Sequence, residues 1–191
     1  MKVNSSIELH GGWIENGARE CVSPHFNARP DNEVSLLVIH SISLPVGCYG
    51  GPYIDQLFQG CLDIEADRDF VELKGLAVSA HFMIRRDGEI VQYVSCDERA
   101  WHAGISAYQG RQACNDFSIG IEMEGTDLKD YTDIQYHELT RLTLALFATY
   151  PMLNMDTLVG HSDIAPGRKT DPGESFDWVR YREGLSKVQS E

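Results

Sequence analysis

Apolar residues occur along the chain in short runs separated by polar turns, and two of these runs predict long strands. Residues 35–39 (SLLVI) form a continuous apolar run, as expected of a strand covered on both faces, and the run ends on His40. Residues 118–123 (SIGIEM) alternate with a period of two. In that strand the apolar side chains share one face, and the opposite face carries Ser118, Gly120 and Glu122.

Three further segments complete the predicted sheet. Residues 81–85 and 90–94 flank residues 86–89, where the Asp-Gly pair supplies the positive φ of a tight hairpin turn. Residues 158–160 (LVG) predict a short strand that delivers His161.

The strongest helix prediction covers residues 133–150. Thr132 and Gln135 have capping-box spacing at its start, and Pro151 follows its end. Its apolar side chains recur at helical spacing and predict a core face, made of Leu139, Leu142, Leu146, Phe147 and Tyr150.

Shorter helices are predicted from Pro52 through Phe58, inside a turn-rich region 45–74, and over residues 176–185. Strands interleaved with helices indicate an α/β (α+β) fold, with a mixed central β-sheet flanked by helices.

Composition limits the class of protein. The 191 residues, 42% of them apolar, fit a single domain over residues 1–191. A formal net charge of -13 argues against binding to nucleic acid or to an anionic membrane. No run approaches the length of a transmembrane helix, and residues 1–13 have no signal-like apolar run, so we expect a cytoplasmic protein. The five cysteines include no C-x-x-C pair and predict reduced packing thiols.

The candidate chemistry begins with His40, His161 and Asp171. Two imidazoles and one carboxylate are the donor set of a catalytic zinc site, which keeps its fourth position open. From spacing alone, this pattern does not distinguish a metal site from hydrogen-bonded structural histidines. His161 and Asp163 also fit the H-x-D of non-haem iron oxygenases, but no histidine follows His161, where those enzymes generally place their remaining ligand.

Several motifs in order make a more specific pattern. They are residues 37–40 (LVIH), 79–82 (SAHF), 101–104 (WHAG), 115–122 (NDFSIGIE) and 160–173 (GHSDIAPGRKTDPG). Together they resemble the amidase-2 and peptidoglycan-recognition-protein superfamily of N-acetylmuramoyl-L-alanine amidases. Residues 23–27 (SPHFN) and 175–178 (SFDW) resemble its cytosolic members, which act on 1,6-anhydromuramoyl peptides.

The resemblance implies one zinc ion per chain, bound by His40, His161 and Asp171, with Glu122 and Lys169 assisting catalysis. Glu122 would move a proton from water to the leaving amine, in room left by Gly120, and Lys169 would donate to the oxyanion. Glu124 faces the same way as Glu122, but we expect it to be a solvated residue at the strand end.

The residues that contact substrate are harder to identify from the sequence. An acidic peptide calls for basic partners such as Arg85, with Arg86 and Arg111 as alternatives, and the sugar would stack on Trp101 or Tyr108. His102 is expected either to contact substrate or to tune the metal site. Ala77 and Ala113 stand where the family carries arginines near the sugar, which leaves sugar recognition open.

The sequence therefore predicts a zinc-dependent amidase that cuts between the lactyl group of 1,6-anhydro-N-acetylmuramic acid and L-alanine, in cytosolic peptidoglycan recycling. Its expected partners are anhydromuramoyl peptides, with no obligate protein partner. Two alternatives are a recognition module that binds peptidoglycan without cutting it, and an amidase that acts on intact cell wall.

Overall fold

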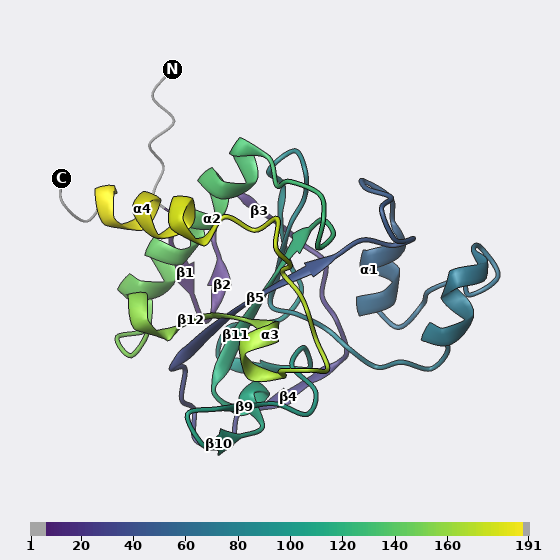
Figure 1. Cartoon of the computed structure of the whole chain (residues 1–191). Helices are drawn as coiled ribbons and strands as arrows, with labels where there is room; N and C mark the ends of the chain where they lie inside the picture. Colours follow the sequence, from purple (N-terminus) through teal and green to yellow (C-terminus); the bar gives the residue numbers. More distant parts are fainter. Residues whose placement is uncertain (1–6, 189–191) are drawn as a thin grey trace.

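A six-stranded mixed sheet forms the centre of the molecule (Figure 1). The computed structural model describes residues 7–188. The sheet order is β12 (Leu158–Gly160), β5 (Leu36–Ile42), β11 (Ser118–Glu124), β6 (Phe82–Ile84), β7 (Ile90–Gln92) and β3 (Ala18–Glu20). Neighbouring strands are parallel, except for the antiparallel hairpin of β6 and β7. The predicted mixed sheet is confirmed.

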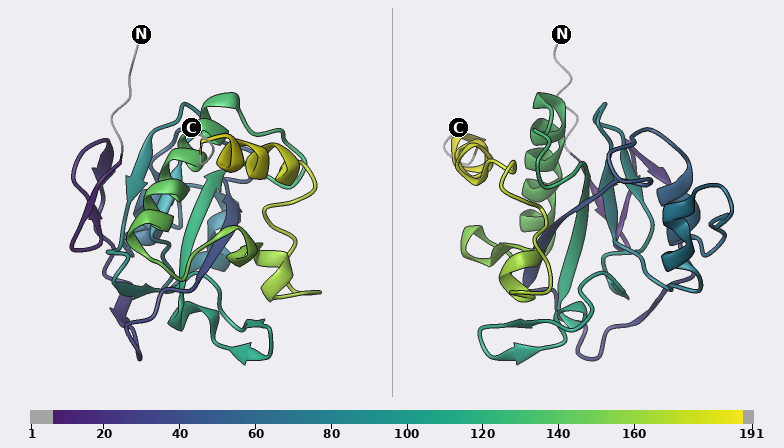
Figure 2. Two further views of the ribbon diagram at one scale, coloured as in Figure 1. Left: turned by 90° about the vertical axis from the view of Figure 1, so that its left-hand side faces the viewer. Right: turned by 45° about the vertical axis from the view of Figure 1, so that its right-hand side comes forward.

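Helices cover both faces of this sheet (Figure 2). α2 (Asp133–Thr149) and α4 (Trp178–Val188) lie on one face, and α1 (Tyr53–Phe58) lies on the other. The capping box predicted for α2 is present, because the Thr132 hydroxyl accepts from Gln135 N–H and the Gln135 side chain accepts from Thr132 N–H. The short α3 (His161–Ile164) follows β12 directly.

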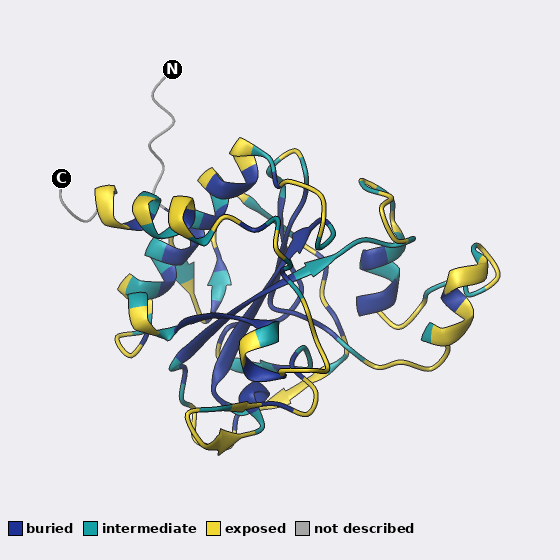
Figure 3. Ribbon diagram, in the orientation of Figure 1, coloured by how far each residue is buried: buried dark blue, intermediate teal, exposed yellow. Residues whose placement is uncertain are grey.

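The two faces of the central strands bury different groups. The α2 face packs Ile119, Ile121 and Met123 of β11 against the leucines predicted for the helix core face, Leu139, Leu142 and Leu146. On the opposite face, His40 and Glu122 lie within strands whose residues are almost entirely buried (Figure 3). The α2 face thus builds the largest apolar cluster, and the opposite face carries His40 and Glu122 together with two smaller apolar clusters.

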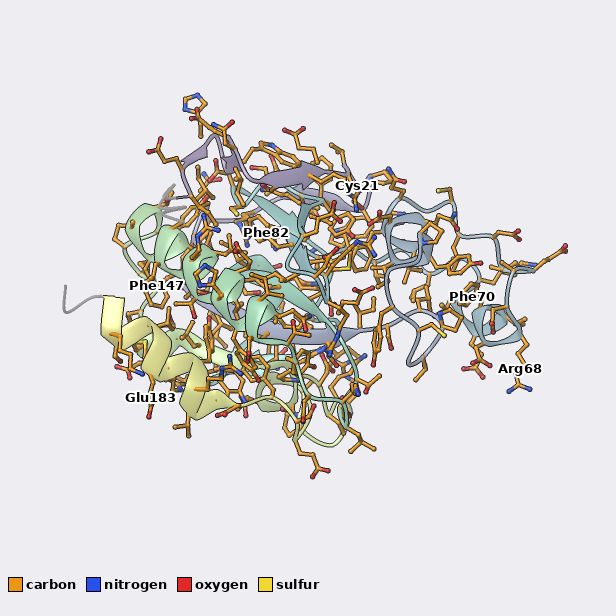
Figure 4. All side chains as sticks on the ribbon, turned by 90° about the horizontal axis from the view of Figure 1, so that it is seen from above. Cys21, Arg68, Phe70, Phe82, Phe147 and Glu183 are labelled. Atoms are coloured by element: carbon orange, nitrogen blue, oxygen red, sulfur yellow. The ribbon has the colours of Figure 1, made fainter. Side chains whose placement is uncertain are left out.

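Residues 43–76 leave the sheet on the side away from α2 and return to it. This excursion holds α1 and a 3-10 helix, η1 (Arg68–Leu73). Figure 4 shows Phe70 and Arg68 at its far end, opposite Phe147 and Glu183 of the helical layer. Phe70 is fully buried against the Tyr53 ring, so the excursion carries its own small apolar centre.

Short strand pairs were not predicted. They are β1 (Leu9–His10) with β2 (Trp13–Ile14), β4 (Phe26–Ala28) with β8 (Glu98–Ala100), and β9 (Ala107–Tyr108) with β10 (Arg111–Gln112). These strands have two or three residues each and show no clear period in the sequence. The remaining helical segments are the 3-10 turns η2 (Cys114–Asp116) and η3 (Met155–Thr157).

The structure corrects the expectation for Glu124. Its side chain is 1% exposed, and its carboxylate accepts from the backbone N–H groups of Gly50 and Arg86 and lies 3.5 Å from the Arg85 guanidinium. Glu124 is therefore a buried residue that ties the excursion to the sheet, and not a solvated one.

All five cysteines are free thiols, and three of them are buried. Within residues 7–188, no helix combines the length and the apolar character needed to cross a membrane.

Candidate metal and catalytic site

His40, His161 and Asp171 converge on the face of the sheet opposite α2, although they come from three different elements. His40 projects from the middle of β5, and His161 is the first residue of α3. Asp171 lies in the loop after α3, where its carbonyl accepts from Ser162 N–H and the next carbonyl, of Pro172, accepts from the Tyr131 hydroxyl. These contacts hold the loop against α3 and against the segment before α2.

Three donor atoms of this trio form a nearly equilateral triangle. His40 Nδ1 lies 2.9 Å from His161 Nδ1 and 3.2 Å from Asp171 Oδ2, and the third side measures 3.1 Å. In a tetrahedral zinc site with bonds of about 2.0–2.1 Å, ligand atoms stand roughly 3.3 Å apart. The side chains present therefore fit a zinc ion on the cavity side of the triangle.

The outer nitrogens of the two histidines are also engaged. His161 Nε2 lies 3.2 Å from the Ala103 carbonyl, and His40 Nε2 lies 2.9 Å from His102 Nδ1. The Ala103 carbonyl can only accept, so when His161 Nδ1 binds a metal the His161 proton lies on Nε2 and donates to this carbonyl. A backbone carbonyl such as that of Ala103 is a typical outer partner of a metal-binding histidine.

Burial controls the charge of the trio. Burial lowers the pKa of His40 to about 4, with the Asp171 hydrogen bond opposing this effect and the neighbouring His161 adding to it. Burial alone would raise the pKa of Asp171, but hydrogen bonds with His161 and His40 lower it below its usual value overall. At neutral pH the site thus offers a neutral imidazole from His40 and a carboxylate, the forms that bind a metal.

Glu122 lies beside this trio, in the lining of the same cavity. It is in register with His40 on the adjacent parallel strand, and its Oε2 is a buried atom without a hydrogen-bond partner. Burial raises the pKa of Glu122 well above its ordinary value, the Asp171 charge adds to the rise, and Lys169 opposes it. A buried carboxylate of this kind in a cavity is a candidate proton carrier.

One cavity of about 220 Å³ contains most of the predicted site. Its lining includes the trio, Glu122 and Lys169, together with Trp101 and His102. Leu57, Phe58 and Leu76 of the excursion form an apolar wall. The Trp101 ring stacks on His25 at 5.9 Å, and its Nε1–H donates to Asn27, so its orientation is fixed.

The structure corrects the expected role of Gly120. A Cβ on this residue would lie 2.5–2.8 Å from three atoms of the His102 ring. The space beside Gly120 therefore holds that ring, and not a ligand or a water molecule.

Two predicted substrate contacts do not line this cavity. The Arg85 guanidinium is paired with the carboxylates of Asp55, Glu89 and Glu124 below the excursion. The Tyr108 hydroxyl donates to the Asp156 carbonyl beside a separate surface hollow. Arg111 pairs with Glu33, and Arg86 donates to the Asp130 carbonyl.

Ala77 is exposed, and Ala113 lines a second hollow next to Arg168. Neither residue brings a charge to the site cavity.

Two residues that hold the loop beside the site were not predicted from the sequence. Arg168 donates to the carbonyls of Ala103 and Ile105, which holds the loop that receives His161 Nε2–H. Asn115 Oδ1 accepts from the backbone N–H groups of His102 and Ala103. Both residues lie inside the motifs, but only the folded loop reveals their partners. Asp163, the alternative ligand, instead accepts from Gly160 N–H at the start of α3.

The chain is also similar to known proteins. A family model described as N-acetylmuramoyl-L-alanine amidase matches residues 30–174. The chain is 58% identical over 180 residues to the 1,6-anhydro-N-acetylmuramyl-L-alanine amidase AmpD of Escherichia coli (strain K12), covering 94% of this chain and 97% of that protein.

Two solved structures extend the comparison. The crystal structure of a selenomethionine AmpD derivative superposes with a TM-score of 0.90 at 57% identity, covering 93% of this chain and 98% of that one. The complex of the E. coli amidase AmiD with the substrate anhydro-N-acetylmuramic acid-L-Ala-D-gamma-Glu-L-Lys superposes with a TM-score of 0.58 at 27% identity. That alignment covers 94% of this chain and 65% of the other.

Proposed function

The chain belongs to the N-acetylmuramoyl-L-alanine amidase family, and from that premise we propose that it works with one zinc ion bound by His40, His161 and Asp171. It hydrolyses the amide between the lactyl group of 1,6-anhydro-N-acetylmuramic acid and L-alanine. Relatives of similar length are named for this activity. The observation that carries the zinc proposal is the triangle of donor atoms, with sides of 2.9–3.2 Å.

When bound, zinc would polarise the scissile carbonyl and favour the ionised form of the attacking water. Glu122 is the residue that moves the proton in this proposal. Its unpaired Oε2 accepts a proton from the attacking water and delivers it to the leaving nitrogen of L-alanine. A pKa raised by burial suits a group that must both take up and release a proton.

Lys169 supplies positive charge on the same side of the cavity. Its ammonium lowers the pKa of Glu122 and would donate to the oxyanion that forms as the lactyl carbonyl becomes tetrahedral. Trp101 offers a fixed aromatic face at the cavity wall, on which we place the sugar ring.

The substrate class follows from the ligands of relatives. The AmiD complex holds an anhydromuramoyl tripeptide, and we assign substrates of that chemistry to this cavity. The predicted cytoplasmic location stays a prediction, for cell fractionation to test.

Zinc content and hydrolysis together test the proposal. We expect about one zinc per chain, and chelation should abolish cleavage of anhydromuramoyl-tripeptide until zinc is restored. Full activity in metal-free protein would overturn the mechanism. Equal cleavage of intact sacculi would instead favour the cell-wall amidase, and binding without cleavage would favour the recognition module.

A further inference from the structure

Both ring nitrogens of His102 are used inside the protein, although the residue lines the site cavity. Nδ1 lies 2.9 Å from His40 Nε2, and Nε2 lies 3.2 Å from the Ser118 hydroxyl. Contact with substrate is therefore left to the carbon atoms of the ring. This arrangement favours the second of the two roles predicted for His102, that of tuning the metal site.

The Cys114 carbonyl, which is the last group in this series of contacts, sets the direction of each hydrogen bond. The Ser118 hydroxyl lies 2.6 Å from the Cys114 carbonyl, which can only accept, so Ser118 donates its single proton there. Ser118 must then accept from His102, which puts the His102 proton on Nε2 and leaves Nδ1 as an acceptor. His40 in turn donates from Nε2.

In this arrangement His40 Nδ1 carries no proton and its lone pair points at His161 and Asp171, whereas the competing Nδ1–H tautomer would donate to Asp171. We propose that His102 is a positioning residue, which holds His40 in the Nε2–H tautomer and presents His40 Nδ1 to the metal. This inference rests on the proposed zinc site and adds a relay that runs from His40 through His102 and Ser118 to a backbone carbonyl.

The surroundings of His102 fix the ring in this role. Gly120 leaves the slot that the ring fills, since any Cβ there would lie 2.5 Å from His102 Cγ. Asn115 Oδ1 accepts from the backbone N–H groups of His102 and Ala103 at 3.1 and 2.8 Å. The ring is thus held from its backbone, its face and both nitrogens.

The two metal-site histidines differ in what receives their outer proton. His161 donates to the Ala103 carbonyl, a backbone acceptor that no substitution removes. His40 donates to a side chain. The tautomer of His40 should therefore respond to changes at positions 102 and 118, and the tautomer of His161 should not.

The test compares His102→Leu, His102→Gln and Ser118→Ala with His137→Leu, a control that removes an exposed histidine on α2. Zinc affinity is measured by competition with a chelator, and histidine tautomers are read from ¹⁵N NMR of the metal-free proteins. We expect His102→Leu to weaken zinc binding about 10–100-fold, the range seen when such outer partners are removed. His102→Gln, whose side-chain oxygen still accepts, should recover part of this loss.

Ser118→Ala should raise the population of the Nδ1–H tautomers of His102 and His40, while His137→Leu matches the wild type. The Ser118→Ala variant also tests the proposal if His102→Leu fails to fold. The positioning role would be overturned if both His102→Gln and His102→Leu kept the wild-type zinc affinity. It would also be overturned if Ser118→Ala left the histidine tautomers unchanged. A wild-type protein that binds no zinc would instead overturn the proposed function.

Discussion

Glu122 and His40 occupy paired positions on the adjacent parallel strands β11 and β5. Side chains in register on neighbouring strands emerge from the same face of the sheet. The sheet itself therefore sets the carboxylate that we propose to carry the proton beside the first histidine of the proposed metal site. This part of the site does not depend on a loop. The pairing separates two functions that can be tested independently, which are proton transfer and metal binding.

Glu122→Gln should lower turnover about 10²–10⁴-fold, the usual contribution of a general acid or base. Zinc content should stay near the wild-type value, because Glu122 is not part of the donor triangle. Steady-state kinetics with zinc analysis of the same sample checks this. Loss of the metal in Glu122→Gln would assign the residue to holding the metal site together.

His161→Ala should weaken zinc binding by more than the roughly 100-fold upper range of outer-partner effects, since a donor atom itself is lost. Hydrolysis should disappear, while binding of the intact substrate persists. Calorimetry with an anhydromuramoyl peptide measures that binding. If the wild type shows the same binding and has no hydrolysis to lose, the protein is a recognition module.

Lys169→Met should reduce kcat about 10²–10³-fold, the loss typical of one oxyanion donor. KM should change little, because the interaction develops only as the carbonyl becomes tetrahedral. Arg168→Met serves as a comparison at the neighbouring residue. It removes the donor to the Ala103 and Ile105 carbonyls and keeps Lys169. A rise in KM at unchanged kcat would make Lys169 a substrate-binding residue.

Glu122 should also make the stability of the metal-free protein depend on pH. Burial, reinforced by Asp171, raises its pKa well above the ordinary 4.5, so the folded state keeps a proton that the unfolded chain releases. Between those two pKa values the folded state binds more protons, and the free energy of unfolding therefore falls as pH rises.

Urea midpoints of metal-free wild type and Glu122→Gln, measured from pH 5 to pH 8, should diverge with increasing pH in favour of the variant. Parallel curves for the two proteins would show that Glu122 titrates normally.

Long patterned segments made most of the fold predictable. β5, β11 and α2 have enough residues to show a continuous run, an alternation or a helical stripe, and His40 and Glu122 were placed with them. The partners of Glu124 were not predictable, because Gly50 and Arg86 reach it from two other segments. The contact between His102 and Gly120 likewise depends on a loop crossing a strand, for which sequence spacing contains no signal.

Arg85 was predicted to contact substrate, and the structure places its guanidinium in a buried group of ion pairs. Its side chain is 9% exposed and lies within 3.5 Å of three carboxylates, among them Glu124, which is 1% exposed. Removing one partner of a buried ion pair typically costs about 3–5 kcal/mol, because a buried charge is left unpaired.

Arg85→Met should therefore lower the free energy of unfolding by about 3 kcal/mol, at the lower end of that range, since Glu124 keeps two backbone donors. Arg68→Met, at a side chain that is 94% exposed, is the matched control and should change stability little. Urea denaturation gives the free energy, and KM for the anhydromuramoyl peptide should match the wild type while the protein is folded. A stable Arg85→Met variant with a raised KM would instead show that Arg85 contacts substrate. That contact would require the excursion of residues 43–76 to open and expose the guanidinium to the cavity.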